Sequence, residues 1–287
     1  MRLSKVKKVG TVFLAGLLMF GALATAGCGK QEASAPPQQP TPGLSGTLTV
    51  AGSTSVQPFS EVLAEEFMAA NKEVQINVQG GGSSVGIESA VSGAAGIGAV
   101  SRSVTSEEKA KGLVDTIIAL DGIAIVVHPS NAISSISTAD VMNIYLGNIK
   151  NWKQLGGLDA PITVVTREDG SGTREAFTSL VMNKKDIIST AIVQNSTGAV
   201  RTTVAGDKNA IGYVSLSSLN QEVKALQVDE IAANEANVKN GTYKLQRPFI
   251  YVTKGEPSGL AKAFIDYVLS PQGQQLIVEE GAITVSK

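Results

Sequence analysis

The sequence predicts an α/β fold with two lobes. Apolar, β-branched runs that are typical of buried strands alternate along the chain with segments whose apolar residues recur at helical spacing. This alternation favours a largely parallel sheet with helices on both faces. Several strand-to-helix turns are rich in glycine, serine and threonine. We expect them at the carboxyl ends of the strands, where sheets of this kind bind ligands.

The chain length agrees with two lobes, because 287 residues suffice for one large domain or two of ordinary size. We expect the chain to leave the first lobe near His128 and to return near Pro248. Lobe I would then comprise residues 46–127 and 249–287, and lobe II residues 128–248. Such a division implies two crossovers between the lobes.

The first 27 residues have the pattern of a secretory signal peptide: four cations and no acid, an apolar run over residues 9–23, and small residues before Cys28. The apolar run is too short for a convincing membrane span. Cys28 is the only cysteine, and it resembles the lipid-modified cysteine of bacterial lipoproteins. Residues 28–45, rich in proline and glutamine, are then expected to form a lipid-anchored linker. The sequence predicts an extracytoplasmic protein anchored to the bacterial cell membrane. A secreted protein with a free thiol is the alternative.

Composition excludes several classes of site. The chain has 24 Lys and Arg and 25 Asp and Glu, and losing the four cations of residues 1–27 leaves a net charge of about −5. The overall field therefore does not attract anions or nucleic acid, and few aromatic residues are present to stack on bases. One histidine and one cysteine speak against a zinc or copper site. No Walker A sequence is present, and we expect no cofactor.

Residues 166–174 (Thr-Arg-Glu-Asp-Gly-Ser-Gly-Thr-Arg) carry the strongest signal for a binding site. They follow the apolar run 162–165 and precede a helical pattern, so their glycines permit close approach to the free N–H groups of a helix N-terminus. Ser171 and Thr173 add hydroxyl donors. Arg167 adds a planar fork of donors that suits a tetrahedral oxyanion, and Asp169 could orient it. The alternative is a glycine turn with a helix cap and a surface ion pair.

Two further turns share this design. Residues 51–56 include Thr54 and Ser55 and precede a helix with Pro58 in its first turn, a position that proline favours. Residues 80–86 include Ser83 and precede another helical pattern. Because three such turns recur, one shared anion is a simpler explanation than three unrelated helix caps.

The chain from Gly46 onward resembles the PstS-type phosphate-binding proteins, the extracytoplasmic receptors of bacterial ABC-type phosphate importers. The resemblance rests on sequence motifs spread along the chain: Gly52-Ser53-Thr54-Ser55, Gly80-Gly81-Gly82-Ser83, Asp121-Gly122-Ile123-Ala124, Asn151-Trp152, residues 167–173, residues 210–214 and Arg247-Pro248-Phe249. It implies a periplasmic-binding-protein fold of type II, with two hinge crossovers and the ligand in the interlobe cleft. It also implies a monomer that binds inorganic phosphate and delivers it to the permease subunits of an importer.

The resemblance also implies residue roles. By position, the residues that bind phosphate are Thr54, Ser55, Ser83, Ser101, Arg167, Ser171, Gly172 and Thr173, while Asp169 orients Arg167. Some relatives have a carboxylate at or near position 101 that accepts the proton of hydrogen phosphate, and many have Asp where this chain has Gly96. The proton acceptor is therefore unassigned, with Ser101 and Asp169 as candidates.

The expected activity is binding without catalysis. A receptor or sensor for another tetrahedral oxyanion, such as sulfate, is an alternative. A serine phosphatase or hydrolase that uses Ser171 as nucleophile is a weaker one, because nothing in the sequence places the only histidine, His128, beside Ser171 as a base.

Overall fold

The structure is a computed structural model, and it describes residues 43–285. The predicted signal peptide, Cys28 and the linker as far as residue 42 lie outside the described residues. Residues 43–285 belong to one compact unit. Within that unit, no helix has the length and apolar character needed to cross a bilayer.

A nine-stranded sheet runs through the described residues, in the order β2-β1-β3-β11-β4-β8-β6-β7, with β9 beside β4. Its strands are β1 (Gly46–Gly52), β2 (Val74–Gly80), β3 (Ile97–Val100), β4 (Leu113–Val127), β6 (Thr163–Arg167), β7 (Ile192–Gln194), β8 (Ala210–Ser215), β9 (Lys224–Ala225) and β11 (Gln246–Lys254). β5 (Ser135–Ile136) and β10 (Gln227–Val228) form a separate parallel pair. β1 is parallel to β2 and β3, and β6 is parallel to β7 and β8. The two long central strands, β4 and β11, are antiparallel.

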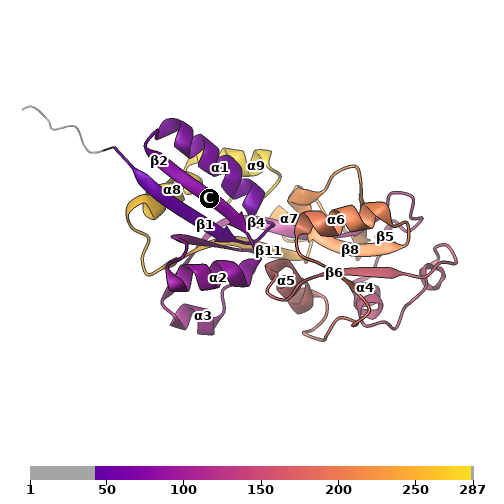
Figure 1. The fold of residues 1–287 in the computed structure, drawn as a ribbon. Helices are drawn as coiled ribbons and strands as arrows, with labels where there is room; N and C mark the ends of the chain where they lie inside the picture. Colours follow the sequence, from indigo (N-terminus) through magenta and orange to yellow (C-terminus); the bar gives the residue numbers. More distant parts are fainter. Residues whose placement is uncertain (1–42, 286–287) are drawn as a thin grey trace, which may run out of the picture. The chain divides into compact units, whose positions relative to one another are not determined.

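Helices cover both faces of each half of this sheet (Figure 1). In lobe I, α1 (Gln57–Ala70), α8 (Gly259–Leu269) and α9 (Pro271–Glu279) pack on one face, and α2 (Ser83–Ser92) packs on the other beside α3 (Ser106–Ala110). In lobe II, α4 (Thr138–Tyr145) and α5 (Gly172–Leu180) lie opposite α6 (Thr197–Gly206). The remaining helices are α7 (Glu235–Lys239) and the 3-10 turns η1 (Trp152–Leu155) and η2 (Leu216–Ser218). Each lobe therefore has a core on both sides of the sheet.

Local sequence explains where the helices begin. α1 carries its proline in the first turn, where the missing N–H has no partner to lose. Ser137 caps α4 by accepting a hydrogen bond from Asp140 N at 3.0 Å, and serine is one of the residues preferred at this position. Serine side chains also cap α5 and α6, at Ser171 and Ser196. Polar turns thus leave the N-termini of α5 and α6 directly after strands β6 and β7.

β4 joins two apolar, β-branched runs, residues 114–119 and 123–127, which Asp121-Gly122 separates in the sequence and which alone would suggest two strands. β4 continues through both residues because β11 pairs with it across this point, with Arg247 opposite Asp121 and Gln246 opposite Gly122. A long-range strand partner therefore overrides the local turn preference of an Asp-Gly pair.

The first passage between the lobes also differs from the expectation. Up to Gly122, β4 pairs with β11, and from Ile123 onward it pairs with β8 of lobe II. Ile123, Ile125 and Val127 belong to the core that contains α4 and α5. The passage therefore lies at residues 120–123, and the predicted boundary at 127/128 is wrong. An uninterrupted apolar strand gives no sequence signal for the point at which it changes lobes.

A buried ion pair lies at this passage. Asp121 Oδ2 accepts hydrogen bonds from Arg247 Nε and Nη2 at 3.0 and 2.9 Å, and Ser215 Oγ donates to Asp121 Oδ1 at 2.7 Å. The two side chains are 0% and 2% exposed. Burial raises the pKa of Asp121, whereas the charge of Arg247 and the hydrogen bond from Ser215 oppose the rise. The pair fixes β4 to β11 where both strands join the lobes.

We predict that Asp121→Ala lowers the free energy of unfolding by about 3–5 kcal/mol, because it leaves the Arg247 charge buried without its partner. Urea denaturation followed by circular dichroism measures the change. The double variant Asp121→Leu with Arg247→Met removes both charges and should recover most of the loss. An Asp121→Ala variant as stable as the unmodified protein would contradict the importance of this pair.

Candidate anion-binding site

The N-termini of four helices meet between the lobes. Ser55 lies just before α1, and its Oγ is 2.9 Å from Oγ1 of Thr173 in the first turn of α5. The same Ser55 Oγ is 2.8 Å from Oγ1 of Thr197, the first residue of α6. At the start of α2, Ser84 N donates to Gly170 O at 3.1 Å. Helix N-termini present free N–H groups and a partial positive charge, so their convergence favours an anion.

Arg167, at the end of β6, connects these turns. Its side chain is 2% exposed. Nη1 donates to Thr197 Oγ1 at 3.2 Å, and Nη2 donates across the lobes to Thr54 Oγ1 at 3.1 Å. Nε and Nη2 also donate to the two carboxylate oxygens of Glu168, each at 2.7 Å. The guanidinium is therefore held in one orientation by contacts from both lobes.

Asp169 does not orient Arg167, and this prediction is wrong. The Glu168 carboxylate occupies one edge of the guanidinium with both of its oxygens. Asp169 instead pairs with Arg174 at 2.8 Å, and its side chain is 95% exposed. The same exposure makes Asp169 unsuitable as the proton acceptor inside the site. The two acids are adjacent in sequence, and only the backbone path into the turn at Gly170 decides which one reaches Arg167.

A second arginine, Arg247, also reaches the site, although no role was predicted for it from the sequence. Its Nη1 donates to Thr173 Oγ1 at 2.7 Å and to Ser101 O at 3.1 Å, and its Nη2 donates to Ser55 Oγ at 3.2 Å. One signal could have found it. Asp121 interrupts an apolar strand, and a buried carboxylate in such a strand requires a cationic or hydrogen-bonding partner.

The remaining predicted residues lie at the same place. Ser83 Oγ accepts from Ser101 N at 3.0 Å and is 3.4 Å from Ser101 Oγ. A Cβ added to Gly172 would collide with Ser83 Oγ and lie 2.7 Å from Ser101 Oγ, so the start of α5 touches lobe I. Ser171 is buried and caps α5 by accepting from Arg174 N at 3.3 Å. The structure thus brings together the predicted hydroxyl residues and Thr197, for which no role was predicted.

Carboxylates contribute to the site only through the arginines. Glu168 is paired with Arg167, and Asp121 is paired with Arg247. Gly96 lies one residue before β3, whereas Ser101 follows the other end of that strand, so position 96 is remote from the hydroxyls. The groups that converge on the site are consequently hydroxyls, guanidinium groups and helix N–H groups.

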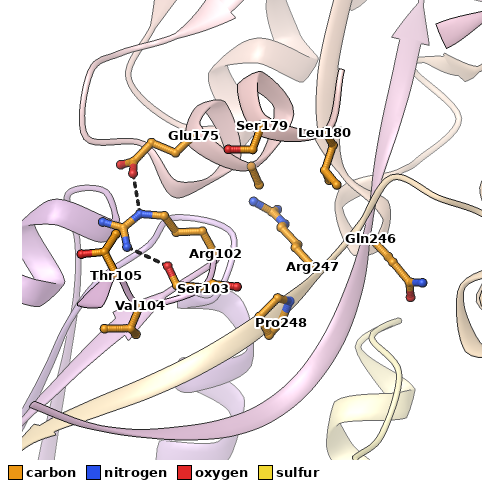
Figure 2. A pocket seen from close by; sticks show the side chains of 11 residues that line it. Arg102, Ser103, Val104, Thr105, Glu175, Ser179, Leu180, Gln246, Arg247 and Pro248 are labelled. Carbon is orange, nitrogen blue, oxygen red and sulfur yellow. Dashed lines mark hydrogen bonds and ion pairs between the residues drawn. The ribbon is translucent and has the colours of Figure 1, made fainter. Parts of the chain in front are cut away.

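A cavity of about 310 Å³ adjoins the site and lies between the lobes, lined by residues that include Arg102, Val104, Leu180, Arg247 and Pro248. Figure 2 shows Glu175 of α5 directed at Arg102, whose Nε is 2.6 Å away. Burial raises the pKa of Glu175, although the charge of Arg102 opposes the rise. Arg102 is also held by both oxygens of Glu108 at 2.8 Å. The Glu175 side chain is 40% exposed, so solvent screens this interlobe ion pair and it adds little to lobe closure.

Titratable side chains show no other centre of chemistry in the described part of the chain. Over residues 43–285, no cluster of three or more His, Cys, Asp or Glu has the arrangement to hold a metal ion. His128 lies after β4, where its Nδ1 is 2.8 Å from Ser130 Oγ. Neither observation adds a catalytic group to the anion site.

Comparison with known proteins agrees with this geometry. The family model of the PBP superfamily domain matches residues 37–272. The phosphate-binding protein PstS of Bacillus subtilis is 39% identical over 248 residues, which cover 84% of this chain and 82% of that protein. A substrate-binding protein from Clostridium perfringens, assigned to a phosphate ABC transporter and crystallised with bound phosphate, is 41% identical with a TM-score of 0.82. That match covers 84% of this chain and all of the Clostridium chain. An ABC-type phosphate transport receptor from Vibrio cholerae is 38% identical over 83% of this chain and 99% of its own, with a TM-score of 0.71.

The fold and the position of the site between two lobes define a solute-binding protein of the PBP superfamily, as the sequence predicted. Within that superfamily, the chain belongs to the PstS family of phosphate-binding proteins.

Gly172→Ala should prevent the lobes from meeting, because the new Cβ would lie 2.9 Å from Ser83 Cβ and collide with its hydroxyl. We predict that the hydrogen bond from Ser84 N to Gly170 O is broken in a crystal structure of the variant. The free energy of unfolding should change by less than about 1 kcal/mol, since alanine is a good helix former. The matched control is Gly198→Ala in the first turn of α6, where nothing lies within 4 Å of the added Cβ. Intact lobe contacts in Gly172→Ala would disprove the close approach.

Proposed function

We propose that this protein binds inorganic phosphate with high affinity and delivers it to the permease of an ABC-type importer. The observation that carries the proposal is the convergence of two buried arginines and the hydroxyls of four helix N-termini between the lobes. The names of the relatives support phosphate as the anion, since the Clostridium perfringens structure, at 41% identity, contains bound phosphate.

Binding relies on local donors. The mature chain has a net charge of about −5, so its overall field repels phosphate. A hydrogen bond that involves a charged group contributes roughly 1.5–3 kcal/mol, and several of them together offset that repulsion and the loss of the anion's water shell. Contacts from both lobes imply that closure around β4 and β11 completes the site and excludes solvent. We assign Thr54, Ser55, Ser83, Ser101, Arg167, Ser171, Gly172 and Thr173 to this site, and add Thr197.

We propose that the protein acts without catalysis. Ser171 Oγ accepts a hydrogen bond from the backbone of its own helix, and His128 is hydrogen-bonded within its own turn. Neither contact provides a nucleophile with a general base. Sustained release of product from a chromogenic phosphate ester would favour the hydrolase alternative.

We also propose that Cys28 carries a lipid anchor, which holds a monomeric receptor at the outer side of the cell membrane. The basic, apolar and small-residue order of residues 1–27 supports this proposal. Mass spectrometry of the membrane-bound protein should show an amino-terminal peptide that begins at Cys28 and carries acyl chains. An amino-terminal peptide with an unmodified Cys28 would reject the anchor without affecting the binding proposal.

A receptor for another tetrahedral oxyanion is the second candidate. It is favoured by one observation: the carboxylates Glu168 and Asp121 are both engaged with arginines, so neither is free to accept a proton from hydrogen phosphate. Competition titrations of phosphate against sulfate decide between the two candidates. Stronger binding of sulfate than of phosphate at neutral pH would favour the second.

Arg167→Ala should weaken phosphate binding by about 2–5 kcal/mol, because it removes a buried charged donor and leaves Glu168 without its partner. Isothermal titration calorimetry of the full chain with inorganic phosphate measures the change. The matched control is Arg201→Ala, which removes an arginine whose side chain is 30% exposed and donates to Ser218 O. Unchanged affinity in Arg167→Ala would contradict the assignment.

Phosphate affinity should rise between pH 5 and pH 8. A site whose converging groups donate hydrogen bonds favours the phosphate form with the fewest protons, since a protonated oxygen would place its hydrogen against a donor. Sulfate carries no proton in this pH range, so its affinity should change much less with pH. Calorimetric titrations at several pH values measure both. Tighter phosphate binding at pH 5 than at pH 8 would indicate a hydrogen-bond acceptor in the site.

A further inference from the structure

Arg247 uses its whole hydrogen-bonding capacity inside the protein. A guanidinium group has five N–H donors and no acceptor. Nε and Nη2 donate to Asp121, Nη2 also donates to Ser55 Oγ, and Nη1 donates to Thr173 Oγ1 and Ser101 O. If Arg247 served only to neutralise Asp121, the contacts with the carboxylate would suffice. The other three join β11 to groups of the anion site.

These contacts make the hydroxyl groups of Ser55 and Thr173 hydrogen-bond acceptors toward Arg247. Because Arg247 can only donate, Ser55 Oγ and Thr173 Oγ1 must accept from it, and their own protons point to other acceptors. Arg167 likewise donates to Thr54 and Thr197, so two hydroxyls of each lobe accept from an arginine. In this structure Ser55 shares hydrogen bonds with Thr173 and Thr197, and a bound anion can take the place of these contacts as the acceptor.

Arg247 also contacts both lobes at once. Ser55 precedes α1 in lobe I, and Thr173 lies in the first turn of α5 in lobe II. Arg247 itself is on β11, which passes between the lobes, and its side chain is 2% exposed. A single guanidinium can hold both hydroxyls only when the lobes are closed, so its contacts depend on the same closure that completes the site.

We propose that Arg247 is a positioning residue of the anion site: it orients the Ser55 and Thr173 hydroxyls as donors toward the bound anion and couples them to the passage between the lobes. This inference rests on the proposed binding of phosphate. Its consequence is that the shape of the guanidinium matters as well as its charge, because a lysine ammonium cannot reach two hydroxyls, a carbonyl and a carboxylate in the same fixed plane.

The first test is Arg247→Lys, which retains the positive charge beside Asp121. Calorimetry with inorganic phosphate should show affinity weakened by about 10- to 100-fold, the loss expected for hydrogen bonds from a charged donor. The matched control is Arg201→Lys, an arginine of α6 that donates to Ser218 O and should leave the affinity unchanged. Wild-type affinity in Arg247→Lys would overturn the inference. Failure of the unmodified protein to bind phosphate would instead reject the proposed function.

The second test separates positioning from a purely structural role. A double-mutant cycle combines Arg247→Lys with Thr173→Val, which removes the hydroxyl and keeps the shape of the side chain. If Arg247 acts through Thr173, the double variant should bind phosphate about tenfold more tightly than the product of the two single losses predicts. A loss equal to that product would mean that Arg247 does not act through this hydroxyl.

A third variant keeps the inference testable if Arg247→Lys does not fold. Asp121→Leu with Arg247→Met removes the buried pair as a unit, which buried ion pairs often tolerate. We expect this protein to unfold near the wild-type temperature and yet to bind phosphate at least about tenfold more weakly, because the two hydroxyls have lost their donor. A stable double variant with wild-type affinity would overturn the inference.

Discussion

The hydrogen-bonded ion pair of Asp121 and Arg247 connects the strands that pass between the lobes to the anion site. β4 and β11 carry the chain between the lobes, and this pair lies where the two strands run side by side. A buried charge without a partner is strongly destabilising, so each residue requires the other. The same arginine then extends to Ser55 and Thr173, one from each lobe. The strands that hold the lobes together are therefore also the strands that support the hydroxyl groups between them.

The site attracts an anion through the direction of its donors more than through net charge. Each of its arginines is paired with a carboxylate, Arg167 with Glu168 and Arg247 with Asp121. What remains is a set of helix N-termini and hydroxyls, four of which accept a hydrogen bond from a guanidinium group. Thr54 Oγ1, for example, accepts both from Arg167 Nη2 and from Thr197 N. Such an arrangement suits a small ligand whose atoms accept hydrogen bonds on all sides. It can bind an anion although the net charge of the protein is negative.

The parts of this structure that depend on neighbouring residues were predictable from the sequence. The alternation of apolar, β-branched runs with helical spacing predicted the α/β class. The Gly, Ser and Thr turns placed Thr54, Ser83 and Arg167 at one site, because the residues of the first turn determine where a helix starts. The parts that depend on distant residues were not. Arg247 is 126 positions away from Asp121, and β4 continues through Asp121-Gly122 only because β11 lies beside it. Glu168 and not Asp169 pairs with Arg167 because of the direction of its side chain. The sequence of two adjacent acids does not show which of them faces the arginine.

The central claim is that loops far apart in the chain surround one small tetrahedral anion between the lobes. A crystal structure of the protein grown with arsenate tests it most directly, because arsenate has the shape and charge of phosphate and arsenic can be located by its anomalous scattering. We expect a single arsenic position within hydrogen-bonding distance of Thr54, Ser83 and Arg167, with contacts from both lobes. An arsenic position elsewhere on the protein, or contacts from one lobe alone, would contradict it.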